Sequence, residues 1–354
     1  MISIIGGGPV GSYQAYCLAK KGHKVHVYEG KEKIGTPVQC TGILTHPLKD
    51  YINIKKSFLQ NTINKAKIIA PNGDDTTIKF KQEDYLVCRT KFDQHIADLA
   101  EQEGAKIFLK HRYKGNEGTK IKVGDKVVPT KALIGADGPH SAVAKAHNML
   151  KDRKFVIGHQ VTVELEVDDP HLMEIWVGLG MFSWCVPEGN GICRVGIVSY
   201  DKPVEYLNKL LKMRCPKAKI IGKQTGHIPL YNPKQILQKN NVYLIGDAAT
   251  HVKATSFGGI IPGMKAATIL ARDMNNYQQT CKKEVGKDLY LSLMIRKILD
   301  RFSEKDYNDL IKKFQNEKLI KILEANSRDF PTKFALQLFL AKPSLLKFAK
   351  HLIF

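Results

Sequence analysis

The sequence places glycines where a chain must pass close to a phosphate. Gly6-Gly7-Gly8-Pro9-Val10-Gly11 follows a short apolar strand and opens a predicted helix. In this pattern the first glycine permits a tight turn, the second lets backbone amides approach a pyrophosphate, and the third lets helix and strand pack closely. Glu29, at the end of the next predicted strand, is placed to bind a ribose. The predicted dinucleotide contacts are Gly6, Gly8, Pro9, Val10, Gly11, Glu29 and Gly30.

A second motif, far along the chain, favours a flavin dinucleotide over a nicotinamide one. Gly246-Asp247 ends an apolar strand and precedes a predicted helix. An acid at this point can accept a hydrogen bond from a ribityl hydroxyl. The amides of Gly258, Gly259 and Ile260 can face the electron-rich edge of a flavin and stabilise charge that develops on reduction. The expected cofactor is therefore FAD.

Two further candidates also lie where a predicted strand gives way to a turn or helix. Arg89 stands at a strand-to-helix junction with Asp93 just after it, and Asp137 lies in the turn Gly135–Ser141. We predict that Arg89 and Asp137 contact the cofactor. Each residue also has a structural interpretation, as part of a tight turn or as a helix cap, and for Asp137 both interpretations stay open.

One cysteine and two aromatic residues are candidates for chemistry and substrate contact. Cys40 lies in a glycine-flanked loop with Thr41 and Gly42. A positioned thiol can deliver a proton, whereas most cysteines are small buried apolar residues. Phe182 and Trp184 alternate along a predicted strand and so share one face. That face either lines a site for an apolar substrate or packs in the core of a sheet.

Hydrophobic patterning predicts two interleaved domains. The fold class is α/β (α+β), with a Rossmann-like FAD-binding domain interleaved with an antiparallel-sheet substrate domain, plus a helical C-terminal region. The expected bounds are 1–153 and 238–280 for the FAD-binding domain, which also carries some catalytic-domain strands near 63–88. The substrate or catalytic domain is expected over 154–237, and the helical region over 281–354.

Composition narrows the class of protein. We expect a cytoplasmic protein, because no apolar run approaches a membrane span and the N-terminus lacks the features of a signal peptide. Seven scattered cysteines without a C-x-x-C pair argue against a disulfide framework and against a zinc site. The net charge of +21 suits anionic lipid or an anionic substrate, or reflects only a lysine-rich genome. Nucleic acid is not an expected partner, because no zinc finger or RNA-recognition signature occurs.

Together, the motifs resemble the p-hydroxybenzoate hydroxylase-type flavoproteins over roughly residues 1–275. Three stretches are similar to the geranylgeranyl reductase family: Pro37–Gly42, Gly180–Pro187 and Gly246–Met264. In the second stretch, the family's signature positions are taken by Phe182, Trp184 and Pro187. The sequence departs from the family at three positions, with Phe182 for tyrosine, Val186 for phenylalanine and Phe257 for the first of three glycines.

The resemblance implies reduction of isolated carbon–carbon double bonds in prenyl chains, and in archaea of geranylgeranyl groups of ether lipids. It implies Cys40 as proton donor or relay, a cofactor contact by Cys40, Thr41 and Gly42, and a prenyl site at Phe182, Trp184 and Pro187. The electron donor stays open among NAD(P)H, ferredoxin as an electron-donor protein and another reductant. The alternatives are an FAD-dependent monooxygenase or halogenase of the same superfamily, and a non-catalytic FAD- or lipid-binding protein.

The C-terminal residues 343–354 predict an amphipathic helix. No Asp or Glu follows Asp329 in the sequence. The predicted helix either contacts an anionic membrane surface, as a peripheral protein on the cytoplasmic face, or packs on the protein's own core. The residues that share its apolar face are Leu345, Phe348, Ala349 and Leu352, flanked by Leu346 and Ile353.

Overall fold

The chain forms two compact units, each built from segments far apart in the sequence. The computed structural model describes residues 1–352. The first unit comprises Met1–Val38, Cys88–Lys154 and Pro229–Tyr290; the second comprises Gln39–Val87, Phe155–Ile228 and the chain from Leu291 onwards. The predicted fold class is confirmed, with a Rossmann-like sheet, a largely antiparallel sheet and a helical C-terminal part. Residues 281–290 are counted with the first unit, and the later helices with the second.

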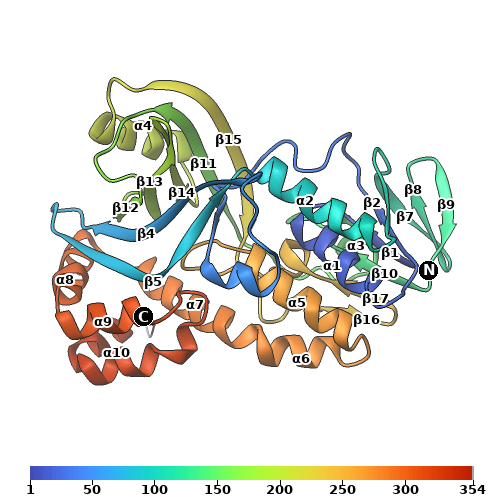
Figure 1. The fold of residues 1–354 in the computed structure, drawn as a ribbon. Helices are drawn as coiled ribbons and strands as arrows, with labels where there is room; N and C mark the ends of the chain where they lie inside the picture. The colour runs from blue at the N-terminus through green and yellow to red at the C-terminus, as the bar shows by residue number, and fades with distance from the viewer. Residues whose placement is uncertain (353–354) are drawn as a thin grey trace. The chain divides into compact units, whose positions relative to one another are not determined.

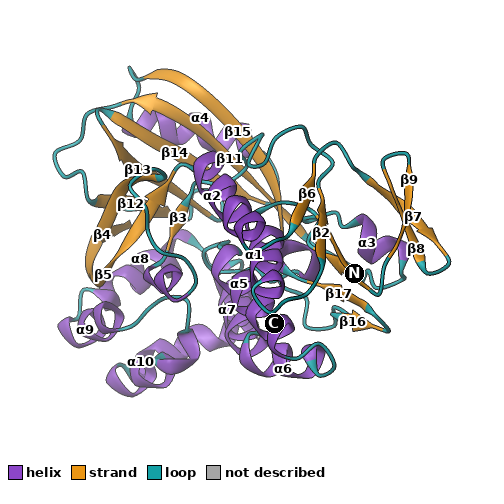
Figure 2. Ribbon diagram, turned by 45° about the vertical axis from the view of Figure 1, so that its right-hand side comes forward, coloured by secondary structure: helices purple, strands orange, loops and turns teal. Residues whose placement is uncertain are grey.

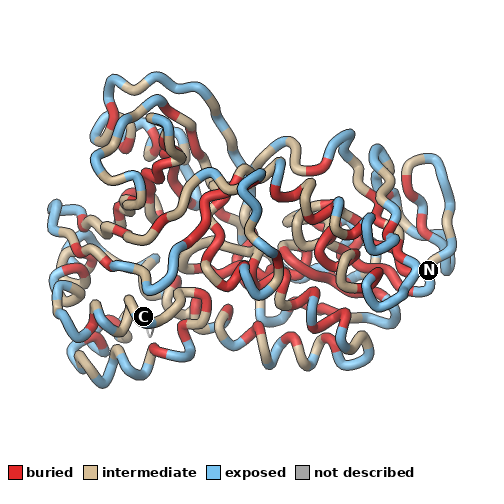
Figure 3. The backbone as a smooth tube through the Cα atoms, in the orientation of Figure 1, coloured by how far each residue is buried: buried red, intermediate tan, exposed pale blue. Residues whose placement is uncertain are grey.

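The first unit contains a six-stranded sheet that is parallel except at one edge (Figure 1). Strands β1 and β10 are buried at every residue, as expected for a parallel sheet covered on both faces, and Figure 3 shows this buried backbone in red. Ile5, the last residue of β1, stands beside Gly135 of β10 and Tyr28 of β2. The strands, in spatial order, are β16 (Gln238–Lys239), β17 (Val242–Leu244), β10 (Ala132–Gly135), β1 (Ile2–Ile5), β2 (Val25–Tyr28) and β6 (Lys106–Phe108).

Helix α1 is the central helix of this unit, because it contacts both α2 and α5 (Figure 2). A small three-stranded sheet stands apart from the main one. Its strands are β7 (Tyr113–Glu117), β8 (Lys120–Val123) and β9 (Lys126–Pro129). The helices are α1 (Pro9–Ala19), α2 (Arg89–Gln102), α3 (Ala142–Ala146), α5 (Ile260–Arg272) and α6 (Tyr277–Glu284), with a 3-10 turn η2 at Gly246–Ala249.

The second unit contains an eight-stranded sheet. The segment expected over 63–88 forms two long strands of this sheet, and β4 pairs with β12 in parallel while β11, β14, β13 and β12 pair antiparallel. The strands, in spatial order, are β15 (Lys219–Pro229), β11 (Phe155–Glu164), β14 (Ile192–Ser199), β13 (Phe182–Gly189), β12 (Leu172–Val177), β4 (Leu59–Ile69), β5 (Asp75–Val87) and β3 (Ile43–Leu44); a 3-10 helix η1 covers His46–Asp50.

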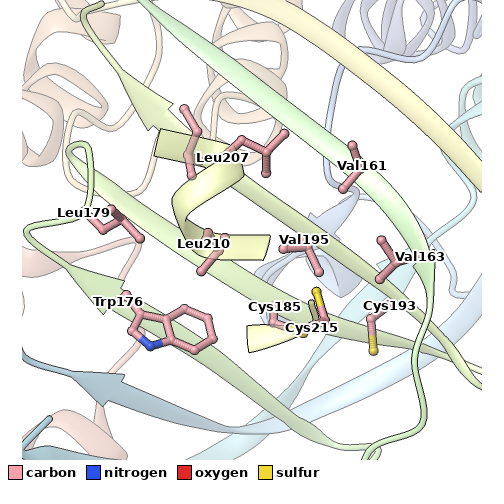
Figure 4. Close-up of a cluster of buried hydrophobic side chains, with 11 residues drawn as sticks. Val161, Val163, Trp176, Leu179, Cys185, Cys193, Val195, Leu207, Leu210 and Cys215 are labelled. Atoms are coloured by element: carbon pink, nitrogen blue, oxygen red, sulfur yellow. The ribbon is translucent and has the colours of Figure 1, made fainter. Parts of the chain in front are cut away.

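One face of this sheet is covered by α4 (Pro203–Arg214). Leu207 and Leu210 of α4 enter a cluster of buried side chains from β11, β13 and β14, seen in Figure 4. The cluster includes Cys185, Cys193 and Cys215. Thus the sheet has one dry face, and the side chains that alternate with the cluster point to the other face.

The C-terminal helices close the second unit with a core of their own. Leu345 and Phe348 are buried against Leu319, so the terminal segment packs on this unit. The predicted helix is present over Pro343–Leu352 and is of the 3-10 type. The predicted contact of Ile353 lies outside the described residues. The elements are α7 (Gly286–Leu299), which begins in the first unit, α8 (Glu304–Phe314), α9 (Glu317–Ala325), η3 (Pro331–Lys333), α10 (Ala335–Ala341) and η4 (Pro343–Leu352).

Within residues 1–352, none of the helices combines the length and the hydropathy needed to cross a bilayer.

Candidate functional site

The loop between β1 and α1 has two positions where only glycine fits. Gly6 has a φ of +102°, and a Cβ on it would lie 2.4 Å from the carbonyl oxygen of Ala136. A Cβ on Gly11 would lie 2.0 Å from the carbonyl oxygen of Gly6. Any side chain at Gly11 would therefore push α1 away from β1. The close approach sets the N-terminus of α1, beginning at Pro9, beside the carboxyl ends of β1 and β10, where its unpaired N–H groups can meet a phosphate.

Glu29 is held at the end of β2 by two backbone donors. The N–H of Gly7 donates to its Oε2 at 2.8 Å, and the N–H of Lys31 donates to its Oε1 at 2.9 Å. Each oxygen keeps a second lone pair for a ligand hydroxyl. Apart from Gly8 itself and its two chain neighbours, no atom of the described chain lies within 4 Å of the position that a Cβ on Gly8 would take. The space beside Gly8 is therefore open, and Gly30, which follows Glu29 in the chain, lies against Arg112.

Val10 joins the first glycine motif to the second. A Cβ on Gly263 in α5 would lie 2.6 Å from Val10 Cγ2. Gly246 has a φ of +60°, and a Cβ on it would lie 3.3 Å from Val10 Cγ1. Because α1 and α5 meet so closely at Val10, the predicted motifs Gly6–Gly11 and Gly246-Asp247 come together within the first unit. The structure thus brings together motifs about 240 positions apart in the sequence.

Asp247 faces the start of α5. A Cβ on Gly259 would lie 2.9 Å from Asp247 Oδ1, and Ile260 is the first residue of the helix. Burial raises the pKa of Asp247 from 3.8 to about 6, while the charges of Arg89 and Arg153 oppose the rise. The residue keeps partial contact with solvent. A partly desolvated carboxylate that a ligand can reach gains from a hydroxyl donor, as the predicted ribityl contact requires.

Arg89 holds Asp93 in a bidentate ion pair at the start of α2. Nε donates to Oδ1 at 2.9 Å and Nη2 donates to Oδ2 at 2.8 Å. The side chains are 13% and 5% exposed, so the pair is largely buried. Arg89 acts on Asp247 through its charge. Its predicted contact with the cofactor itself stays a prediction.

The turn after β10 holds Asp137 against the start of α3, while its predicted contact with the cofactor stays a prediction. Its carboxylate accepts a hydrogen bond from Ser141 Oγ at 2.6 Å and another from the N–H of Val143 at 3.0 Å, at the start of α3. Arg153, which was not among the predicted site residues, donates to the carbonyl oxygens of Pro139 at 2.7 Å and Ala248 at 2.5 Å. Arg153 therefore ties this turn to the Gly246-Asp247 turn. No periodic or motif signal in the sequence marks it.

The turn before α5 is compact and contains a residue that departs from the family pattern. Phe257 has a φ of +55°, a region that favours glycine, so a glycine would be less strained there. The N–H of Phe257 donates to the carbonyl oxygen of Lys253 at 2.7 Å. Lys253 is 5% exposed, and its Nζ lies 3.3 Å from where a Cβ on Gly258 would stand. This lysine, also missed, places positive charge beside the amides predicted to face a flavin.

The Cys40 loop belongs to the second unit, where Arg194 fixes it. The N–H of Gly42 donates to Cys40 Sγ at 3.4 Å, and the N–H of Val87 donates to the carbonyl oxygen of Gly42 at 2.9 Å. Arg194 donates to the carbonyl oxygen of Thr41 and, at 3.3 Å, to that of Val87. The thiol is half-buried, so it is sheltered yet accessible.

Arg194 was not among the predicted site residues, although a charged residue inside an apolar strand is a signal that the sequence contains. Its Nε donates to Glu188 Oε2 at 2.7 Å, and Nη2 donates to Gln60 Oε1. The residue is 8% exposed in the middle of the apolar run Ile192–Val198. A charge inside an apolar strand is expensive unless it is fully paired, which is itself an indication of a specific role.

The aromatic residues share the sheet face that carries Arg194. Phe182 and Trp184 lie with ring centroids 5.8 Å apart, and Trp184 Nε1 donates to Gln160 Oε1 at 3.1 Å. The Trp184 ring lies over Gly196, where a Cβ would meet it at 2.4 Å. Pro187 pairs with Cys193 and so lies on the opposite, α4-covered face. Of the three residues predicted for the prenyl site, the structure brings together the two aromatics and not Pro187.

Comparisons with known proteins agree with this geometry. Residues 4–42 match the model of the NAD(P)-binding Rossmann-like domain. The digeranylgeranylglycerophospholipid reductase of Methanococcus vannielii is 29% identical over 390 residues, covering 99% of this chain and 98% of that protein. Digeranylgeranylglycerophospholipid reductase 1 of Methanococcoides burtonii is 28% identical, covering 87% of this chain and 85% of that protein.

Solved structures show the same fold. A geranylgeranyl bacteriochlorophyll reductase-like protein from Thermoplasma acidophilum matches with a TM-score of 0.85 at 22% identity, covering 98% of this chain and 97% of that one. A flavin-dependent brominase matches with a TM-score of 0.67 at 19% identity, covering 96% and 99%.

Fold and site together define a protein with a Rossmann-type dinucleotide-binding unit and a second unit built on a largely antiparallel sheet. The open space at Gly8, the oriented Glu29 carboxylate and the partly exposed Asp247 carboxyl fit FAD. The chain is similar to digeranylgeranylglycerophospholipid reductases over nearly its full length, and the predicted resemblance to the geranylgeranyl reductase family is confirmed.

Proposed function

We propose that this protein is an FAD-dependent reductase that saturates carbon–carbon double bonds in the geranylgeranyl chains of ether lipids. The observation that carries the proposal is the near-full-length similarity to proteins named for this reaction, in a chain that keeps the Cys40 loop. The brominase-like neighbours support only the shared fold, and the match to the reductase-like structure is closer by TM-score.

The residues of the first unit hold the cofactor in this proposal. The first turn of α1 receives the pyrophosphate, Glu29 receives the adenosine ribose, and Asp247 receives a ribityl hydroxyl. The amides of Gly258 and Gly259 and the Lys253 ammonium stabilise negative charge on the flavin. When bound and reduced, FAD supplies a hydride to one alkene carbon.

The second alkene carbon needs a proton, which Cys40 supplies. Arg194 fixes the Cys40 loop through the carbonyl oxygen of Thr41, so the thiol has a defined position. Because hydride addition alone would leave an electron pair, and so negative charge, on the second carbon of an unactivated alkene, proton delivery must be coupled to it, and a positioned acid contributes roughly 10²–10⁴-fold. The half-buried thiol regains its proton from solvent. Phe182 and Trp184 offer the apolar surface that a prenyl chain requires.

Single-turnover kinetics tests the proposal. Photoreduced protein is mixed anaerobically with a geranylgeranyl lipid, and flavin oxidation is followed by absorbance. The lipid product is identified from its mass by mass spectrometry. Cys40→Ala should keep the FAD spectrum and slow flavin oxidation by roughly 10²–10⁴-fold, and Cys40→Ser should recover only part of the rate. Cys17→Ala, at another half-buried cysteine, is the matched control. A wild-type rate in Cys40→Ala would assign the proton to another group.

Photoreduction reduces the flavin without its natural electron donor, so the reaction with the lipid is measured independently of that donor. NAD(P)H, ferredoxin and other reductants are then tested as donors. It also separates the reductase from its main competitor. If no prenyl lipid oxidises the reduced protein, while oxygen with an aromatic substrate does, the protein is a monooxygenase or halogenase instead.

A further inference from the structure

Helix α10 is apolar around nearly its whole circumference. Its sequence, ALQLFLA, contains one polar residue. On the inner side, Leu338 and Ala341 pack against the cluster of Leu319, Leu345 and Phe348, which fixes the helix on the second unit. A helix that is apolar on every side is normally covered on every side.

The outer side of α10 is nevertheless exposed. Leu336 is 69%, Phe339 40% and Leu340 73% exposed, and their spacing of three and four positions puts them on one helix face. Leu346, on the neighbouring η4, is 55% exposed. We call Leu336, Phe339, Leu340 and Leu346 the terminal apolar face; Figure 3 shows much of α10 and η4 outside the buried class. Four large exposed apolar side chains on two contacting elements indicate an interaction surface.

The charge around this face selects the partner. The sequence after Asp329 contains four lysines and no Asp or Glu. Lys347 is paired with Asp309, while Lys333 and Lys350 are exposed and Lys342 is partly so. A second copy of this chain docked face to face would bring these lysines together, which is unfavourable. An anionic lipid surface attracts them and also accepts the leucines.

We propose that the terminal apolar face docks on an anionic membrane surface, with its leucines at the headgroup boundary and the lysines on lipid phosphates. This deepens the proposed function, on which it rests for the lipid nature of the substrate. It also differs from the sequence expectation, because Leu345 and Phe348 of the predicted membrane face are buried in the protein.

Vesicle co-sedimentation of the FAD-loaded protein tests the proposal. Vesicles of phosphatidylcholine with phosphatidylglycerol are compared with vesicles of phosphatidylcholine alone, at about 0.1 M and about 1 M salt, where the Debye length falls from roughly 10 Å to roughly 3 Å. The wild type should bind the anionic vesicles and release them at high salt. Leu336→Gln with Leu340→Gln should weaken binding by about tenfold or more, since both side chains lose apolar burial.

The matched control is Val204→Gln with Met213→Gln on α4, whose side chains are 57% and 54% exposed but lie among charged residues. Point changes replace deletion of 343–352, because deletion would open the Leu319 cluster. Flavin content and melting temperature should not change in either double variant.

Three results would overturn the docking proposal. The first is no binding of the wild type to anionic vesicles, and the second is an equal loss of binding in the control variant. The third is that the wild type is a dimer in solution and the Leu336→Gln, Leu340→Gln variant a monomer, with the same affinity for vesicles. The third would assign the face to a second copy. Reduction of a detergent-dispersed geranylgeranyl lipid is measured separately. Its absence with vesicle binding intact would refute the proposed function and leave the docking surface standing.

Discussion

Asp247→Asn should stabilise the FAD-free protein while weakening its hold on FAD. Burial raises the pKa of Asp247 from 3.8 to about 6, which means that the folded protein disfavours the charged carboxylate even with Arg89 and Arg153 nearby. Asparagine has the size of the neutral acid and removes the charge. It also replaces one of the two carboxylate oxygens by an NH2 group that only donates, and leaves a neutral and therefore weaker acceptor for the proposed ribityl contact.

The magnitude follows from linkage between protonation and folding. Because the folded pKa lies above the unfolded one, Asp247 favours folding below about pH 4, and this contribution is lost as the pH rises through 6. A pKa difference of about 2 at about 1.4 kcal/mol each gives at most about 3 kcal/mol above pH 6. Since Asp247 keeps partial contact with solvent, we expect about 1.5–3 kcal/mol for Asp247→Asn at pH 8 and nearly none at pH 4.

Urea unfolding of both apoproteins at pH 4, 6 and 8 measures this difference, and flavin fluorescence titration at pH 8 measures FAD affinity. Equal unfolding free energies at pH 4 with a growing advantage for the variant at higher pH would support the argument. A variant that is less stable at pH 8 would mean that the carboxylate makes a net favourable interaction in the folded protein. Unchanged FAD affinity would remove Asp247 from the cofactor site.

Three further changes test other parts of the site. Glu29→Ala should weaken FAD binding by about 10- to 100-fold in fluorescence titration, because two backbone donors lose their acceptor, whereas Glu32→Ala on the exposed surface should not; equal effects would remove Glu29 from the site. Arg194→Gln should lower the unfolding free energy by about 3–5 kcal/mol in urea and speed thiol modification of Cys40; an unchanged modification rate would show that the loop holds without Arg194. Gly11→Val should abolish folding or FAD binding, seen by circular dichroism and absorbance, because its Cβ would lie 2.0 Å from a backbone oxygen; a yellow, folded variant would contradict the close helix–strand approach.

The parts of the fold that the sequence predicts are those set by local patterns. The apolar runs that become β1 and β17 each end in a glycine turn. Strand and turn are predictable here because both depend on residue types at consecutive positions. The same holds for Glu29, whose place at the end of β2 follows from strand length alone. The contact of Val10 with Gly246 and Gly263 was not predictable, because helix packing depends on shapes that meet only in the folded chain.

Arg194 illustrates a second kind of contact that local sequence patterns do not predict, the contact between distant segments. The arginine contacts Thr41, which lies 153 positions away, and no periodicity connects the two segments. Its interruption of an apolar strand could have shown that it is paired, since an unpaired buried guanidinium is too costly, but not with what. For Asp137, by contrast, neighbouring residues were enough to predict a helix cap as one of its two interpretations. Its carboxylate accepts hydrogen bonds from Ser141 and Val143 at the start of α3, as turn chemistry allows.

The terminal segment shows why amphipathicity alone does not identify a membrane contact. A helical period assigns Leu345 and Phe348 to one apolar face, but it says only that something covers that face, and in the structure Leu319 and its neighbours do. The preceding ALQLFLA stretch has too few polar residues to be amphipathic, so amphipathicity does not identify it as a candidate for membrane contact. Once one side of that stretch packs on the protein, its other side must remain apolar and exposed. Leu336 and Leu340 are therefore the residues that indicate a membrane contact, because both side chains stay largely exposed although α10 packs on the protein.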